Sequence, residues 1–114
     1  MKISKFEDLI AWKKAGILTT NLYSCFSNCK DYSFKDQIQR AGISIMNNIS
    51  EGFERNTNKQ FINFLYIAKG SCGEVRSMLY MALKLNYISK EGFLLNHNLS
   101  IEVSKLIYGL VKTL

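Results

Sequence analysis

The fold is decided by residues 57–86, which read TNKQFINFLYIAKGSCGEVRSMLYMALKLN. Apolar residues recur here at alternating steps of four and three, a spacing that keeps them on one face of an α-helix. The positions are Phe61, Leu65, Ala68, Cys72, Val75, Leu79 and Ala82. Thr57 and Gln60 have the spacing of a capping box, in which each side chain bonds the backbone N–H of the other residue. The pattern predicts a helix over 58–86 that buries one face.

Three more segments have the same spacing and predict helices over 6–29, 33–54 and 90–113. Their expected core positions are Ala11, Ala15, Leu18, Leu22, Cys25 and Cys29 in the first, Phe34, Ile38, Ala41, Ile45 and Ile49 in the second, and Leu95, Leu99, Val103, Leu106 and Leu110 in the last. Proline, which helix interiors reject, is absent from all 114 residues. Long helices joined by short connections run antiparallel. Residues 1–114 are therefore expected to form a single all-α domain, an antiparallel up-down-up-down four-helix bundle.

The breaks between these segments carry helix-end signals. Ser33 and Ser89 are the expected N-caps of the second and fourth helices, because a hydroxyl there can accept a hydrogen bond from a free backbone N–H. Gly52 or Asn56 is expected to end the second helix, since both residue types tolerate the conformations of C-terminal caps. The sequence does not decide between the two positions.

Composition excludes several classes of protein. Hydrophobic residues make up 47% of the chain, which excludes disorder. No stretch approaches the roughly 18 uninterrupted apolar residues of a membrane span, and the first residues lack the apolar core of a signal peptide. Three cysteines are an odd number that no set of disulfides absorbs. These features predict a cytoplasmic protein, since free thiols persist in reducing compartments.

The net charge of +6 is expected to gather at the middle of the bundle. The cations at that level are Lys13, Lys14, Arg40, Lys69, Arg76 and Lys105, against Glu74 and Glu102. Clustered cations of this kind neutralise phosphates, and tyrosines on the outer face of the helix over 58–86 can stack on bases. The alternative is a solvated helix face. The residues expected to bind nucleic acid are Lys13, Lys14, Arg55, Lys59, Lys69 and Arg76.

Catalytic and metal-binding constellations are missing from the sequence. The chain has one histidine, no glycine-rich phosphate loop after a strand and no Ser/His/Asp set, so we predict no catalytic residues, no enzyme activity and no cofactor. A zinc site would have to use Cys25, Cys29, Cys72 and His97. All three cysteines lie at expected core positions, however, where cysteine behaves as a small hydrophobe. We therefore predict that no metal binds.

A polar cluster is expected where the second and third helices face each other. Folding them back across the turn near Asn56 brings Gln37 and Arg40 to the level of Ser71 and Glu74. These four residues would form an interhelical ion pair with hydrogen bonds, which fixes the register of the two helices. A catalytic role for the carboxylates is the alternative.

Apolar residues also recur on faces that a monomeric bundle would expose. The expected oligomer interface consists of Ile10 and Ile17, Ile43, and Leu94, Ile101 and Tyr108. Rows at heptad spacing indicate burial against another helix. Two rows on different helices supply the two distinct surfaces that a ring requires, and Gly70 and Gly73 permit the close approach of a further helix. The alternative is that these rows only widen the core of one bundle.

A more specific signal lies in three short motifs. They are Gln37-Ile38-Gln39-Arg40-Ala41, Asn48-Ile49-Ser50-Glu51-Gly52, and Ala68-Lys69-Gly70-Ser71 followed by Glu74. With them, the chain resembles over roughly residues 6–90 the four-helix bundle proteins encoded in intervening sequences of bacterial 23S ribosomal RNA genes. The resemblance implies a ring of five bundles. It also implies kinship with the accessory variability determinant of diversity-generating retroelements, a basic pentameric barrel that binds nucleic acid and a reverse transcriptase. Gln39 stands where the family often has a second arginine, which implies a weaker basic surface here.

The residues and the resemblance together predict a homo-oligomeric, basic accessory protein that binds RNA or DNA and catalyses no reaction. Its expected partners are further copies of itself in a ring, a pentamer by the resemblance, together with nucleic acid and a protein such as a reverse transcriptase. The alternative is a scaffold whose basic face docks an acidic protein.

Overall fold

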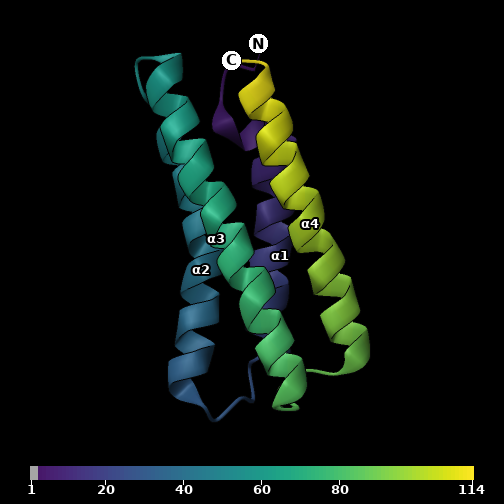
Figure 1. Cartoon of the computed structure of the whole chain (residues 1–114). Helices are drawn as coiled ribbons and strands as arrows, with labels where there is room; N and C mark the ends of the chain where they lie inside the picture. The colour runs from purple at the N-terminus through teal and green to yellow at the C-terminus, as the bar shows by residue number, and fades with distance from the viewer. Residues whose placement is uncertain (1–2) are drawn as a thin grey trace.

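The computed structural model describes residues 3–114, which form a short 3-10 turn (Phe6–Asp8) and four helices. The helices are α1 (Ile10–Cys25), α2 (Tyr32–Phe53), α3 (Asn58–Lys84) and α4 (Lys90–Lys112). Figure 1 shows that successive helices run in opposite directions, with α3 and α4 in front and α1 behind them. No strand occurs within the described range 3–114. The all-α four-helix fold is therefore confirmed, as a bundle that measures 43 × 22 × 19 Å.

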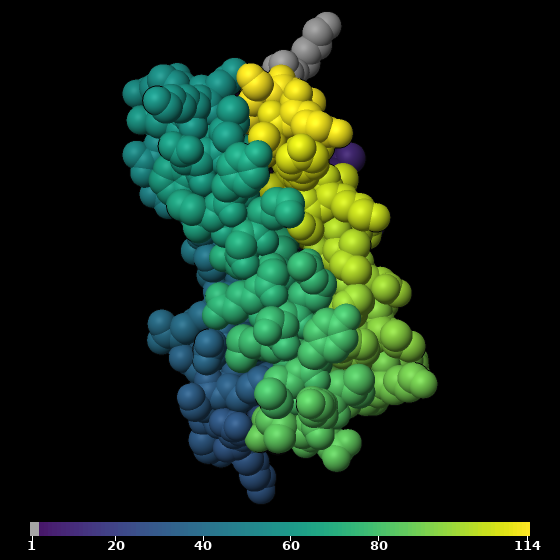
Figure 2. All heavy atoms as spheres, viewed as in Figure 1, coloured from purple at the N-terminus to yellow at the C-terminus, as the bar shows by residue number. Residues whose placement is uncertain are grey.

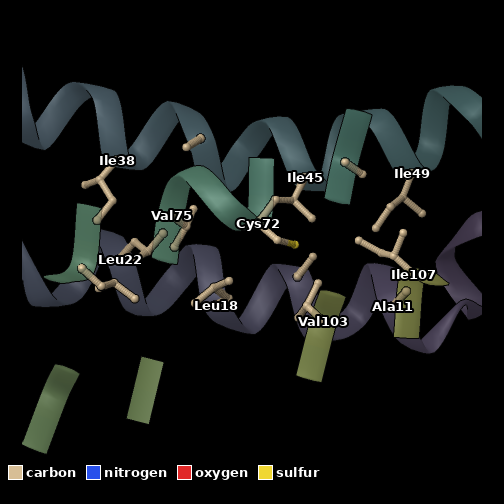
Figure 3. Close-up of a cluster of buried hydrophobic side chains, with 14 of the residues drawn as sticks. Ala11, Leu18, Leu22, Ile38, Ile45, Ile49, Cys72, Val75, Val103 and Ile107 are labelled. Carbon is tan, nitrogen blue, oxygen red and sulfur yellow. The ribbon is translucent and has the colours of Figure 1, made fainter. Parts of the chain in front are cut away.

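The core is organised around α3, as its sequence predicts. All seven expected apolar positions of α3 are buried. Figure 3 shows Cys72 and Val75 of α3 pointing into the space between α1 and α2, where they meet Leu18 and Ile45. The observed end of α3 is Lys84, two residues before the predicted one. Every side of this long helix except its outer face is thus packed.

The first helix is shorter than predicted, and its last core residue differs. The backbone leaves helical geometry at Phe26, with φ −106° and ψ 13°, so α1 ends at Cys25. This change turns the ring of Phe26 into the core, where it packs against Phe34 with 5.8 Å between centroids. Cys25 is exposed and Cys29 is half-buried. The prediction of Cys25 as a core residue is wrong, because the fully buried Phe26 takes the core position at the end of α1.

The buried face of α4 is rotated relative to the prediction. It consists of Phe93, Asn96, Ser100, Val103 and Ile107, so that only Val103 was expected there. Leu95 is 60% exposed. Polar Asn96 and Ser100 tolerate burial because each bonds its own helix: Asn96 Nδ2 donates to the Gly92 carbonyl at 2.9 Å and Ser100 Oγ donates to the His97 carbonyl at 2.7 Å. Leu99, Leu106 and Leu110 pack half-buried at the edge of the core.

The N-caps of α3 and α4 are confirmed, and that of α2 is not. Thr57 Oγ1 accepts from Gln60 N at 3.2 Å, and Ser89 Oγ accepts from Gly92 N at 3.0 Å. The cap of α2 is Asp31, whose Oδ1 accepts from Phe34 N at 3.1 Å. The predicted cap Ser33 already lies inside the helix. A carboxylate two residues earlier therefore sets the start of α2.

The turn between α2 and α3 depends on a glycine, although this glycine does not end the helix. Helix α2 continues to Phe53, with Glu54 as its C-cap, so both predicted end residues are wrong. Gly52 lies buried inside α2, and a Cβ atom there would lie 2.6 Å from Phe64 Cβ. The two helices thus approach each other too closely for any side chain at this position.

None of the helices within residues 3–114 has the length and apolar character that crossing a bilayer requires.

Candidate nucleic-acid interface

A groove between α3 and α4 gathers lysines from both helices. It has a volume of about 330 Å³ and is lined by Lys69, Ser104, Lys105, Tyr108, Gly109 and Lys112. We call it the basic groove. Lys112 Nζ lies 5.3 Å from the centroid of the Tyr108 ring, as in a cation–π contact. Figure 2 views the molecule from this side, where α3 and α4 lie next to each other across the surface.

Arg76 extends the α3 wall of the basic groove. It follows Lys69 by seven residues, or two helical turns, so both lie on the same side of α3. Tyr80, one turn further on, shows that this side faces α4, because its hydroxyl lies 2.9 Å from His97 Nε2. Lys69, Arg76 and Tyr80 therefore form one row along the border with α4.

The cations of this surface lack acidic partners. Within residues 3–114, neither Lys69, Arg76, Lys105 nor Lys112 has a carboxylate oxygen within 4.0 Å. The two central carboxylates are engaged elsewhere: Glu102 Oε2 lies 3.4 Å from Lys14 Nζ, and Glu74 Oε2 accepts from Gln37 Nε2 at 3.4 Å. Uncompensated like charges repel one another, so a polyanion in the basic groove would relieve that repulsion.

The field of these cations reaches the core beneath them. Burial raises the pKa of the Cys72 thiol from 9.0 to about 12, while the positive charges of Arg76 and Lys69 act in the opposite direction. Desolvation prevails because Cys72 is fully buried and its thiolate would lose its hydration. Cys72 is thus a neutral core residue, as predicted.

The other cations expected to bind nucleic acid lie apart from the basic groove. Lys13 lines the border of α1 with α2, and Lys59 is exposed at the start of α3. Lys14 pairs with Glu102. Arg55 pairs with Glu51 at 3.0 Å, and its guanidinium carbon lies 4.7 Å from the Phe64 ring centroid. Of the six expected residues, the structure brings together Lys69 and Arg76.

Lys105 and Lys112 complete the site. Lys105 was expected among the cations at the middle of the bundle but not among the six binding residues, and Lys112 was in neither set. Their spacing of seven residues is a signal that both share one face of α4. The antiparallel arrangement then places them beside Lys69. This signal was missed because the cations were sorted by their level along the bundle and not by the face of α4 on which they lie.

The polar cluster between α2 and α3 forms with different partners. Gln37 contacts Glu74 as expected, but Arg40 does not: its Nε donates to Asp36 Oδ2 at 2.7 Å. The predicted Arg40–Glu74 pair is wrong because Asp36 lies one turn away on the same helix and needs no interhelical reach. Ser71 Oγ instead bonds Ser44 Oγ at 2.9 Å. Both contacts still fix the register of α2 against α3.

Two apolar grooves flank α1. The α1/α4 groove has a volume of about 720 Å³ and is lined by Ile3, Asp8, Leu9, Ile10, Ala11, Asn98, Ile101, Glu102, Lys105, Leu106, Gly109, Leu110 and Thr113. The α1/α2 groove has a volume of about 810 Å³ and is lined by Trp12, Lys13, Gly16, Ile17, Thr19, Thr20, Asn21, Tyr23 and Met46. Ile10 is 60% exposed and Ile17 is 51% exposed. The outer side of α1 therefore exposes two isoleucines, with Lys13 exposed between them along the helix.

The residues expected at an oligomer interface fall into separate places. Ile10 and Ile101 meet in the α1/α4 groove, and Ile17 lies in the α1/α2 groove. Tyr108 lies in the basic groove. Ile43 and Leu94 are exposed outside all three grooves. The structure thus unites one pair of the six.

In the described part of the chain, residues 3–114, no three His, Cys, Asp or Glu side chains lie close enough to hold a metal ion. His97, the single histidine, bonds Tyr80 and stacks on Phe93 with 5.2 Å between centroids. The cations of the basic groove, together with Arg76, are the candidate binding feature of this surface.

Comparison with known proteins identifies the family. The family model of the 23S rRNA-intervening sequence protein matches residues 7–109. This chain belongs to that family. The chain is also similar to a crystal structure from Bacteroides thetaiotaomicron, described as a protein with unknown function from the S23 ribosomal protein family. The two are 30% identical with a TM-score of 0.83, over 90% of this chain and 99% of the other. None of the curated proteins compared with it matches this chain.

The motifs that carry the resemblance to the 23S rRNA-intervening sequence protein family have structural roles. Gly52 lies at the close approach of α2 and α3. Ser71 and Glu74 make the two side-chain hydrogen bonds between these helices. These three residues of the signature are therefore explained by the α2–α3 pairing, while Lys69 of the same motif lines the basic groove.

Proposed function

We propose that this chain is a self-associating protein that binds nucleic acid through the basic groove and catalyses no reaction. The observation that carries the proposal is the convergence of Lys69, Lys105 and Lys112 in one groove, with Arg76 two helical turns from Lys69 on the same side of α3, and none of the four has a carboxylate partner within residues 3–114. Four cations on one surface can replace the counterions of about four phosphates. The three free cysteines support a cytoplasmic location.

The same charge would also suit a scaffold that docks an acidic protein. The aromatic residues of this face favour nucleic acid, because exposed tyrosines next to cations offer stacking surfaces that an acidic peptide does not need. Tyr108 lines the basic groove, and Tyr80 lies one helical turn beyond Arg76 on the side of α3 that faces α4. A reverse transcriptase as a further partner rests on the family resemblance.

The salt dependence of RNA binding tests the proposal. Fluorescence anisotropy with a labelled single-stranded RNA should give a plot of log K against log salt with a slope of roughly −2 to −3, from about −0.7 per phosphate. Lys69→Gln and Lys112→Gln should each make that slope shallower by about 0.7. Lys59→Gln, which removes an exposed charge from α3 outside the basic groove, is the matched control and should keep the wild-type slope.

Competition by polyglutamate distinguishes nucleic-acid binding from the alternative, the docking of an acidic protein. If polyglutamate competes with RNA at equal charge concentration, the basic groove is a site for acidic proteins. A slope near zero for RNA would remove the nucleic-acid proposal altogether.

Self-association is proposed through the two apolar grooves. They lie on different sides of α1, so one copy can offer the α1/α4 groove while its neighbour offers the α1/α2 groove. Two unlike surfaces of this kind generate a ring when the rotation closes. Five copies is the number that the resemblance implies.

A further inference from the structure

We infer that the basic groove binds a single strand of nucleic acid in preference to a duplex. This inference rests on the proposed function and specifies the class of ligand. In it, phosphates lie between Lys69 of α3 and Lys112 of α4, and unpaired bases stack on Tyr108 and Tyr80.

Tyr108 and Tyr80 are separated along the α3–α4 surface by the length of several nucleotides. Tyr108 lies at the level of Lys69, since both line the basic groove, and Tyr80 follows Lys69 by eleven residues. Eleven residues of helix span about 16 Å. That length corresponds to about four or five nucleotides at ~3.4 Å each. Arg76 lies between the two rings along this path and can neutralise a phosphate there.

Both rings are accessible, and one of them is held in place. Tyr108 is 45% exposed and Tyr80 is 54% exposed. The hydroxyl of Tyr80 bonds His97, and its ring packs against Phe93 with 5.2 Å between centroids. A ring fixed in this way loses little conformational freedom when a base stacks on it. Stacking requires an unpaired base, because a duplex hides its base faces within the helix.

Glycines in this region indicate that a backbone from outside comes close. Apart from its chain neighbours and the nearby backbone of its own helix, a Cβ atom at Gly73 or Gly109 would have no atom of the described residues within 4 Å, and the same is true of Gly70. The fold therefore gains nothing from the missing methyl groups, although glycine weakens a helix relative to alanine. Gly109 lines the basic groove, and Gly73 follows Lys69 by one turn on the side that faces α4. A sugar–phosphate strand that lies against the helices would use this space.

The width of the basic groove also favours one strand. Neighbouring packed helices lie ~8–10 Å apart, and a duplex is wider than that space. It would touch the rim of the groove without reaching Gly73 and Gly109. A single strand can follow the groove and contact cations on both walls.

The first test compares a strand with its duplex. Fluorescence anisotropy of the full chain is measured with a labelled 12-nucleotide thymidine strand and with the same strand paired to its complement, at one low salt concentration. The strand should bind at least tenfold more tightly. Tyr108→Leu should weaken strand binding roughly five- to hundredfold, as expected for the loss of one stacking ring. Tyr108→Phe keeps the ring and should stay within twofold of the wild type.

The second test uses alanine where the fold has room for it. Gly73→Ala and Gly109→Ala should raise the melting temperature, because the helices gain propensity without a clash. Both should nevertheless bind the strand several-fold more weakly. Asn47→Ala, an exposed position on α2, is the matched control that should raise the melting temperature and leave binding unchanged. Glycine variants that bind like the wild type would overturn the close approach.

The remaining outcomes separate this inference from the proposed function. Equal affinity for strand and duplex, or a Tyr108→Leu variant that binds the strand like the wild type, would overturn the single-strand preference while nucleic-acid binding stands. Absence of binding to either probe would overturn both.

Discussion

At Gly52 the distance between two helices depends on one missing methyl group. A Cβ atom there would lie 2.6 Å from Phe64 Cβ and 3.0 Å from Phe61 Cδ1. Neither neighbour can move away freely, because Phe61 is buried and Phe64 Cβ is fixed to the α3 backbone. Gly70 has the opposite surroundings, with open space around the same position.

This contrast gives a paired prediction for two glycines. Gly52→Ala should lower the free energy of unfolding by roughly 1–3 kcal/mol, the usual cost of overpacking. Gly70→Ala should raise it by about 0.5–1 kcal/mol, because alanine favours the helix. Urea denaturation followed by circular dichroism measures both. Similar effects of the two substitutions would contradict the close approach of α2 and α3.

Cys72 predicts a loss of stability at high pH. Its pKa is about 12 in the folded protein and 9.0 ordinarily. Between these values the unfolded thiol releases its proton while the folded one keeps it, so stability is full below pH 9 and falls as the pH rises toward 12. From pH 9 to 11, wild type should lose about 1–3 kcal/mol more than Cys72→Ala does, at ~1.36 kcal/mol per pH unit.

The comparison with Cys72→Ala isolates the thiol from other groups that titrate at high pH. The Tyr87 hydroxyl, for example, donates to Asp31 Oδ2 at 2.8 Å, which raises the pKa of Tyr87. Its contribution is the same in both proteins and cancels. If wild type and variant lost stability in parallel above pH 9, Cys72 would not be the desolvated group described here.

The buried positions of α3 could be predicted from the sequence, and those of α4 could not. The apolar face of α3 contains no polar residue, so hydrophobic spacing identified each buried position. In α4, Asn96 and Ser100 occupy the core while Leu95 is exposed. Hydrophobicity alone cannot show that a polar side chain bonds its own helix and thereby tolerates burial. Lys105 was expected among the cations at the middle of the bundle, whereas Lys112 was not.

Contacts between side chains were less predictable than helix faces. Spacing placed Gln37 at the level of Glu74 correctly, because antiparallel register follows from the length of the turn. It could not choose between two acids for Arg40, since that choice depends on rotamers. The basic groove was only half foreseen for a similar reason, because it needs two faces from different helices.

Asn96 allows a prediction for α4. Its side chain is fully buried, and its Oδ1 accepts no hydrogen bond within residues 3–114. An unsatisfied buried acceptor costs about 1–3 kcal/mol. Asn96→Leu should therefore raise the free energy of unfolding by roughly 1 kcal/mol. Thermal melting checks this, with Asn47→Leu at an exposed position of α2, outside the three grooves, as the control. A lower melting temperature for Asn96→Leu would show that its bond to the Gly92 carbonyl outweighs the unsatisfied oxygen.

At the scale of the whole molecule, the α1/α2 groove lies apart from the basic groove, whereas the α1/α4 groove shares Lys105 and Gly109 with it. Because α1 and α3 lie diagonally in the bundle, self-association at the α1/α2 groove would leave the basic groove open, and a copy in the α1/α4 groove would border it. Substitutions that separate assembly from binding must therefore avoid Lys105 and Gly109.

A double substitution tests assembly alone. Ile10→Glu with Ile101→Glu places two charges in the α1/α4 groove and should give a monomer, since buried unpaired charges oppose association. Light scattering should show more than two copies for wild type at micromolar concentration. Leu94→Glu, which is exposed outside the grooves, should leave the mass unchanged. A monomeric wild type would end the proposal of a ring.

The two grooves that border α1 have a consequence for synthesis. With 16 residues α1 is the shortest helix, and both apolar grooves border it. Helices α2 and α3 are joined by a short turn and pinned by Ser44 and Ser71, so their contacts are local and form early. The ribosome releases α1 before either of them. Helix α1 is therefore synthesised first, but we expect it to dock last. Its apolar face should stay exposed to solvent until α2, α3 and α4 have assembled.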